Sequence, residues 1–80
     1  MDIHEILCTL ITELGIMINS EGEFVDLHSI TFMSMIVQIE ETFSITFPDD
    51  LLNMELINSM NTLEIIVKNI VNGVEQNEVY

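Results

Sequence analysis

The stretch DLHSITFMSMIVQIEETFSITFP, residues 26–48, decides the fold of this 80-residue chain. Its apolar residues recur at helical spacing, which predicts a helix that begins near Ser29 and ends at about Thr42 or Phe43. Pro48 disfavours helical geometry in the residue before it, so we expect the segment SITFPDD to end the helix. The helix carries more apolar residues than a single buried stripe needs, and this excess requires an explanation.

The predicted helix has two apolar strips. The first has the spacing of a core stripe and consists of Phe32, Met35, Ile36, Ile39 and Phe43. The second lies off that stripe and consists of Ile30, Met33 and Val37, with Glu40 and Glu41 continuing it as acid. An apolar strip edged by carboxylates suits protein recognition, because apolar area supplies affinity and charge sets the register. The alternative is that a small bundle buries the second strip as well.

Two further long helices are expected. The first, residues 3–15, has Asp2 as its N-cap and ends at Gly15, which supplies a left-handed position. The last begins after the N-cap Ser59 and ends at Asn72 and Gly73. The core stripe of the first helix comprises Ile3, Ile6, Leu7, Leu10, Ile11 and Leu14. The apolar face of the last comprises Met60, Leu63, Ile66, Val67 and Ile70.

The connecting segments are predicted to be irregular, apart from one short helical turn at residues 54–57 that Asn53 caps. Residues 16–26 have turn residues without periodicity, and no alternating run predicts a strand pair. Four apolar residues should fix this loop to the core: Ile16, Ile18, Phe24 and Leu27. The expected fold class is therefore all-α: a small four-helix bundle of three long helices and one short one, with a single domain at residues 1–74 and a flexible tail at 75–80.

Charge is the most extreme feature of the composition. Fourteen acidic residues face one base, Lys68, for a formal net charge of −13. This charge repels nucleic-acid phosphates and anionic lipid headgroups, so we expect no nucleic-acid and no membrane partner. Basic protein surfaces are the expected partners. The alternative is that the acidity only keeps a small apolar protein in solution.

The lengths of the apolar runs and the cysteine content indicate the cellular compartment in which the protein is expected. The apolar runs are far shorter than the roughly 18 residues that a membrane span needs. No basic segment leads into an apolar stretch and cleavage site, so no secretory signal is expected. Cys8 is the single cysteine and cannot form an internal disulfide. We therefore expect a reducing cytoplasm. We also expect the protein to be a monomer.

Ser29 has several interpretations from the residues alone. It can be the N-cap of the second helix, or an ordinary exposed serine. A hydrolase interpretation makes His28 its base and Asp26 the orienting group. Adjacent residues at a helix start point in different directions, and no G-x-S-x-G elbow is present, so we predict no catalytic residues and no enzyme activity.

Metal binding is also weakly supported by the sequence. His4 and Cys8 are one helical turn apart, a spacing that can bind a metal ion, but Cys8 borders the core stripe and is better explained as a small buried hydrophobe. The acidic loop residues Glu21, Glu23 and Asp26 lack the spacing of a calcium-binding loop. We therefore predict no metal site.

An ordered set of segments covers most of the chain from about Phe24 to Ile70. These segments are HSI at 28–30, IEETF at 39–43, ITFPDDLL at 45–52, ELI at 55–57 and NSMNTLEIIV at 58–67. In this order the chain resembles the acyl and peptidyl carrier proteins, which have a D-S-L-like tripeptide at the head of their second helix. The segment ILCTLITELGI also fits their first helix.

The resemblance implies that Ser29 is the attachment point of 4′-phosphopantetheine, joined through a phosphodiester. The arm would hold an acyl, aminoacyl or peptidyl group as a thioester, and a stand-alone carrier of this kind does no chemistry itself. A phosphopantetheinyl transferase would be the first partner, followed by acyl- or aminoacyl-loading and condensing enzymes with basic docking patches. The residues that match the partner-binding positions are Ile30, Met33, Val37, Glu40 and Glu41.

Two alternatives remain open within this resemblance. His28 stands where many fatty-acid and polyketide carriers have aspartate, and a histidine there resembles many peptidyl carriers, which favours amino-acid cargo. The other alternative is a degenerate carrier. Such a protein would be a small acidic helical interaction module whose second helix docks on basic partners without any prosthetic group.

Overall fold

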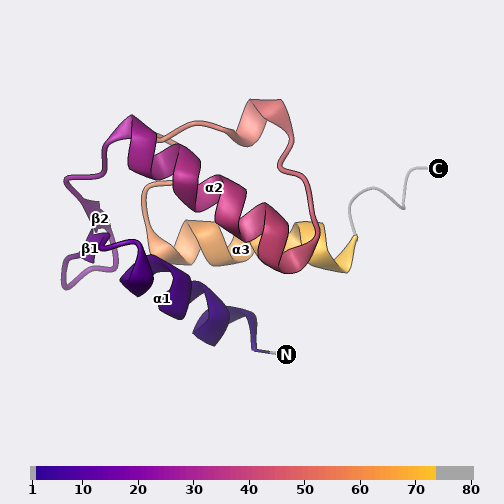
Figure 1. Cartoon of the computed structure of the whole chain (residues 1–80), viewed down its shortest axis with the longest axis horizontal. Helices are drawn as coiled ribbons and strands as arrows, with labels where there is room; N and C mark the ends of the chain where they lie inside the picture. The colour runs from indigo at the N-terminus through magenta and orange to yellow at the C-terminus, as the bar shows by residue number, and fades with distance from the viewer. Residues whose placement is uncertain (1, 74–80) are drawn as a thin grey trace.

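The computed structural model describes residues 2–73 and shows a mostly helical fold (Figure 1). Its three helices are α1 (Ile3–Glu13), α2 (Ser29–Phe43) and α3 (Met60–Asn72). A short 3-10 helix, η1 (Asp49–Leu51), lies between α2 and α3, and two short strands, β1 (Met17–Ile18) and β2 (Phe24–Val25), lie between α1 and α2. Helix α1 contacts both α2 and α3.

The expected signals at the ends of α1 and α3 are confirmed. The Asp2 side chain accepts a hydrogen bond from the Glu5 amide, and the Ser59 side chain accepts one from the Thr62 amide. Gly15 has a φ of 76° and Gly73 a φ of 64°, both in the left-handed region that a residue with a Cβ rarely adopts. These signals fix where α1 and α3 begin and end.

The core confirms the predicted inner face of α2. Phe32, Met35, Ile36 and Ile39 are at most 2% exposed, while Phe43 is half-buried against them. Leu7 and Ile11 of α1 and three residues of α3 complete the helical part of the core: Met60, Leu63 and Val67. Two buried residues outside the helices were not predicted, namely Phe47 at 2% exposed and Ile57 at 0%.

The expected fourth helix is present only as a single turn. The amides of Leu56 and Ile57 donate to the carbonyl of Asn53 at 3.0 and 2.9 Å, and the Asn53 side chain accepts from the Glu55 amide at 2.7 Å. Asn53 thus caps the turn as predicted, but the turn does not extend into a helix. The 3-10 helix η1 precedes it, with Pro48 in extended geometry as its N-cap residue.

The prediction that residues 16–26 form no strand pair is wrong. Met17 pairs with Val25, and Ile18 pairs with Phe24, in a two-stranded antiparallel sheet. The side chain of Asn19 makes the turn between them by accepting hydrogen bonds from the amides of Glu21 and Glu23, both at 2.9 Å. These bonds are local and leave no periodic signal in the sequence.

The hairpin is fixed to the start of α3. The Phe24 amide donates to the carbonyl of Asn58 at 3.0 Å, and the Met60 amide donates to the carbonyl of Gly22 at 2.9 Å. Three of the four apolar residues expected to anchor this segment do pack against the core: Ile16, Phe24 and Leu27. Ile18 does not, since it is 40% exposed.

Within residues 2–73, no helix has both the length and the apolar content needed to cross a bilayer. The expected tail at 75–80 lies outside the described residues.

Candidate functional site

The N-terminal end of α2 is open. His28 is the N-cap residue in extended geometry and its side chain makes no cap hydrogen bond. The first intrahelical bond of α2 runs from the Phe32 amide to the His28 carbonyl at 2.8 Å. The three preceding amides, those of Ser29, Ile30 and Thr31, have no hydrogen-bond partner among residues 2–73. No acidic residue occupies the first turn.

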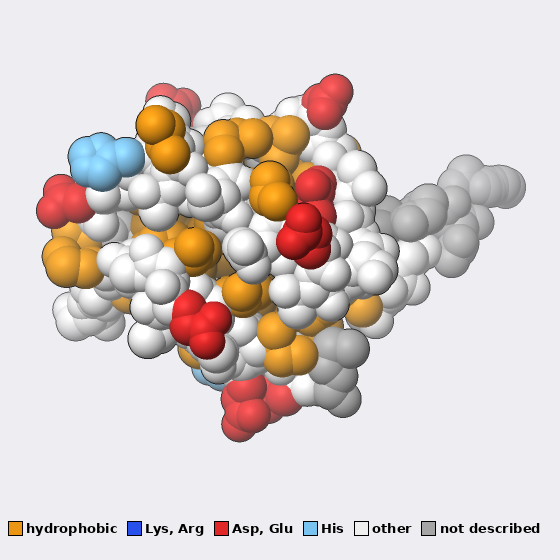
Figure 2. All heavy atoms as spheres, in the orientation of Figure 1, with side chains coloured by type: hydrophobic (Ala, Val, Ile, Leu, Met, Phe, Trp, Pro, Cys, Tyr) orange, Lys and Arg blue, Asp and Glu red, His pale blue; other side chains and the backbone are white. Residues whose placement is uncertain are grey.

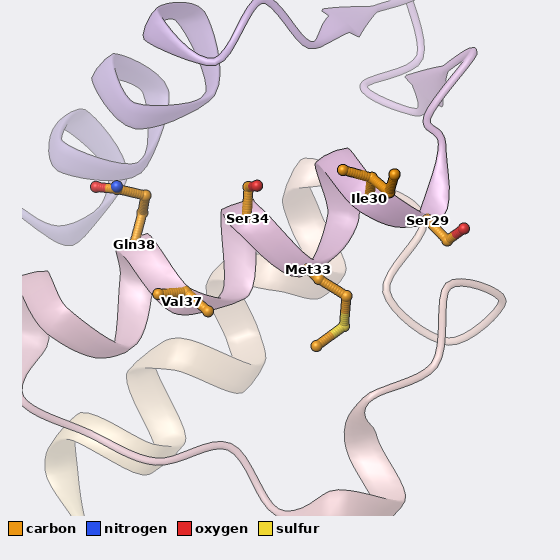
Figure 3. Close-up of a pocket in the computed structure, with 6 residues that line it drawn as sticks. All are labelled: Ser29, Ile30, Met33, Ser34, Val37 and Gln38. Atoms are coloured by element: carbon orange, nitrogen blue, oxygen red, sulfur yellow. The ribbon is translucent and has the colours of Figure 1, made fainter.

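Ser29 is the first residue of α2, so the interpretation of Ser29 as the N-cap is wrong. The helix begins at Ser29 itself because His28 holds the extended conformation that a cap residue needs. The Ser29 side chain is exposed, and its hydroxyl makes no hydrogen bond with any described residue. Figure 3 shows this hydroxyl pointing away from the other labelled side chains. Ser29 therefore offers an accessible oxygen beside open backbone amides.

The second apolar strip of α2 is on the surface. Ile30 is 82% exposed, Met33 46% and Val37 45%, so the alternative that the bundle buries these three residues is wrong. With Ser29, Ser34 and Gln38 they line a shallow depression of about 510 Å³ (Figure 3). All six lining residues belong to α2, so the depression has a single wall.

The surface around α2 combines apolar and acidic side chains. Figure 2 shows hydrophobic side chains and carboxylates together on the surface over α2, and no Lys or Arg side chain is visible on this face. Glu41 is exposed near the C-terminal end of the helix, as the partner-strip prediction requires. Glu40 is half-buried, and its Oε2 accepts a hydrogen bond from the Phe47 amide at 2.8 Å. Glu40 therefore also holds the loop that places Phe47 in the core.

The structure does not assemble the hydrolase arrangement. Asp26, His28 and Ser29 are all exposed, and no hydrogen bond links any two of them. A base that is not bonded to the hydroxyl, without a partner to orient it, does not match the arrangement that activates a nucleophilic serine.

The part of the chain that the structure describes contains no group of His, Cys, Asp and Glu side chains suited to a metal ion. His4 does lie near Cys8, with Nε2 and Sγ 3.5 Å apart, but its Nδ1 contacts the carboxylate of Glu64 on α3. Cys8 packs against the core, as predicted. In the acidic loop, the Glu23 carboxylate accepts a hydrogen bond from the Asn19 side chain at 3.1 Å. These contacts tie local structure together.

The head of α2 fits a phosphodiester. Amides without partners and the helix dipole both favour an anion at a helix N-terminus. Ser29 places an exposed hydroxyl at this end, and the absence of acid from the first turn leaves no neighbouring carboxylate on the helix to repel a phosphate. The other two helix heads differ, since the side chains of Asp2 and Ser59 cap them.

Comparison with known proteins identifies the family. The family model described as "Phosphopantetheine attachment site" matches residues 2–67. Comparisons with curated proteins and with solved structures gave no match. The family match covers well over half of the chain and includes the open head of α2. The protein therefore belongs to the phosphopantetheine attachment-site family of carriers, whose cofactor is covalently attached 4′-phosphopantetheine.

Proposed function

We propose that Ser29 carries the 4′-phosphopantetheine arm and that the protein presents acyl or aminoacyl groups to biosynthetic enzymes in the cytoplasm. The observation that carries this proposal is the exposed, unbonded Ser29 hydroxyl at an uncapped helix head. The arm supplies a terminal thiol that holds the cargo as a thioester. The chain itself does no chemistry on the cargo.

Attachment uses the Ser29 oxygen as the nucleophile. A phosphopantetheinyl transferase joins this oxygen to the phosphorus of coenzyme A that bears the pantetheine arm. The new O–P bond replaces the pyrophosphate O–P bond, 3′,5′-ADP leaves, and a base on the transferase takes the hydroxyl proton. The open amides of Ile30 and Thr31 and the positive end of the α2 dipole then favour the negative charge of the diester.

The exposed strip of α2 is the proposed docking face for the transferase and for the enzymes that load and condense the cargo. Ile30, Met33 and Val37 offer apolar area beside Ser29. Glu40 and Glu41 add negative charge at the far end of the strip, which would attract basic docking patches. An apolar, single-walled face of this shape suits a protein partner better than a small ligand.

The cargo is proposed to be an amino acid. This choice rests on His28, which precedes Ser29 where many fatty-acid carriers have aspartate and many peptidyl carriers have histidine.

Intact-protein mass spectrometry tests the proposal. The protein is incubated with coenzyme A and a panel of phosphopantetheinyl transferases that includes the one from its own host. We expect the mass to rise by one phosphopantetheine arm, and Ser29→Ala to abolish the rise. Ser34→Ala is the matched control, because Ser34 is exposed on the same helix and lines the same depression. Failure with every transferase would overturn the proposal.

That failure would instead favour the second candidate, an acidic interaction module that uses α2 without a prosthetic group. The observation that favours it is the exposure of Ile30, at 82%, on a protein with a net charge of −13. For such a module, the wild-type protein and the Ser29→Ala variant would bind basic proteins equally well.

A further inference from the structure

A second pocket lies at the head of α2 and was not predicted from the sequence. It has a volume of about 320 Å³, and residues from three parts of the chain line it. Leu14 and Ile16 come from the end of α1 and the segment after it, Val25 comes from β2, and Thr31 comes from the first turn of α2. His28, which directly precedes Ser29, also lines this pocket.

The two depressions beside Ser29 differ in their walls. The first is formed by α2 alone, whereas the second has walls from the segment that follows α1, from residues 25–28 and from Thr31 of α2. Small-molecule sites are concave and mostly apolar, with a few polar groups that fix the orientation of the ligand. The second pocket has this composition, since Leu14, Ile16 and Val25 provide apolar surface and Asp26 and His28 provide polar groups.

Asp26 supplies an unpaired negative charge in this lining. Its side chain is exposed and makes no hydrogen bond or ion pair with any described residue. The single Lys or Arg of the chain, Lys68, belongs to α3 and approaches Glu64 at 4.0 Å. The backbone of Asp26 has a φ of 55°, in the left-handed region that asparagine and aspartate enter more readily than other residues with a Cβ. No Lys or Arg of the chain therefore stands beside Asp26, so a ligand or a partner can supply a positive charge there.

We infer that this pocket receives the aminoacyl group carried on the Ser29 arm, with its α-ammonium group facing Asp26 and its side chain against Leu14, Ile16 and Val25. The inference deepens the proposed function and rests on it. An α-amino group has an ordinary pKa of about 8, so it is mostly protonated at neutral pH. The pocket volume, near the lower end of the range for ligand sites, suits a small aminoacyl group better than a long acyl chain or a peptide.

Because the cargo is tethered to Ser29, a weak contact is sufficient to keep it in the pocket for part of the time. The arm begins at Ser29, one residue after a lining residue of the pocket, so the cargo remains within reach of it. A short flexible tether holds its free end at an effective concentration of about millimolar, so even a millimolar affinity fills the pocket half of the time. The cargo therefore spends part of its time against the carrier and leaves it readily for an enzyme.

Nuclear magnetic resonance of the loaded protein tests this inference. Uniformly ¹⁵N-labelled protein is loaded on Ser29 with an alanyl group or a propionyl group, each through an arm whose terminal sulfur is replaced by nitrogen to give a stable amide. The two groups differ only in the amine. We expect the alanyl group to shift the amide resonances of Ile16, Val25 and Leu27 relative to the unloaded arm, and the propionyl group to shift them less.

Asp26→Asn removes the charge and keeps a residue that tolerates the left-handed backbone. We expect this variant to lose the difference between the alanyl and propionyl spectra. Glu21→Gln is the matched control, because Glu21 is an exposed acid of the same hairpin that does not line the pocket. The control should keep the difference.

Other results would overturn the inference. Shifts confined to Met33 and Val37, no shifts on the carrier, or a difference unaffected by Asp26→Asn would each exclude the pocket as the cargo site. The intact mass separates this failure from that of the proposed function. A loaded protein without these shifts refutes only the pocket, whereas a protein that no transferase loads refutes both.

Discussion

Ser59 and Ser29 stand at the heads of consecutive helices, and their side chains differ in exposure and in hydrogen bonding. Ser59 is the half-buried N-cap of α3; its hydroxyl accepts from the Thr62 amide at 3.2 Å and donates to the Thr62 hydroxyl at 3.1 Å. Ser29 is one position further into its helix, exposed and without a hydrogen bond to any described residue. A shift of one residue thus separates a serine that stabilises a helix from one that is available for modification.

The open head of α2 has a cost that the closed head of α3 avoids. An N-cap serine stabilises a helix by about 1 kcal/mol relative to alanine, and the His28 side chain provides no such bond. The same amides that lack a cap are available to an anion. The two heads therefore differ in one respect: a side chain caps α3, whereas the head of α2 is uncapped and open to an anion.

The largest expected effect comes from replacing each serine by alanine. Ser29→Ala should abolish attachment of the arm and change the free energy of unfolding by less than about 0.5 kcal/mol, as a surface substitution does. Ser59→Ala should leave attachment intact and lower the free energy of unfolding by about 1 kcal/mol. Intact mass and urea denaturation measure the two quantities. Equal destabilisation by both variants would contradict the claim that Ser59 stabilises its helix and Ser29 does not.

The next largest effect separates the two faces of α2. Met35→Glu should prevent folding, because Met35 is 0% exposed and a buried carboxylate has no partner there. Met33→Glu should leave the helical circular dichroism nearly unchanged, since Met33 is 46% exposed, yet slow turnover by the transferase. Val37→Glu should behave as Met33→Glu does. If either outer variant unfolds the protein, the outer strip is part of the core.

A smaller effect distinguishes the two glutamates at the end of the strip. Glu40→Ala should lower the free energy of unfolding by about 1–3 kcal/mol, because it leaves the amide of Phe47 without its acceptor. Glu41→Ala should change it by less than about 0.5 kcal/mol, since Glu41 is exposed. Urea denaturation of the two variants measures this difference, and similar values for both would contradict a structural role for Glu40.

The smallest effect is electrostatic. Glu41→Lys should slow association with the transferase severalfold at low salt, because it places a positive charge on a face proposed to meet a basic patch. The difference should vanish near 1 M salt, where the screening length is about 3 Å. Stopped-flow association rates at several salt concentrations measure it. A rate that does not change with Glu41→Lys at low salt would argue against docking guided by acid.

The helices and their buried faces could be predicted because their signals are local and periodic. The spacing of Phe32, Met35, Ile36 and Ile39 identifies one face of α2, and Gly15 marks the end of α1 through its left-handed backbone. The outer strip was also predicted from spacing. Its exposure could not be, because exposure depends on which other elements pack nearby.

The missed features depend on contacts between distant segments or on a single position of register. Phe47 follows α2 in a loop without periodicity, where it is buried and its amide donates a hydrogen bond to Glu40. The strand pair has two residues on each side, too few to alternate. Ser29 was expected at the head of α2, but only the extended backbone of His28 shows that it is the first helical residue. The second pocket could not be predicted because three separate stretches of the chain come together to line it.

Site localisation by fragmentation mass spectrometry tests the central claim most directly. The protein is loaded by the transferase of its own host, digested and fragmented, and the residue that bears the arm is read from the fragment masses. The account predicts a single arm on Ser29 and none on Ser34, which lines the same depression. An arm on any other residue, or an unmodified Ser29 after exposure to that transferase, would contradict it.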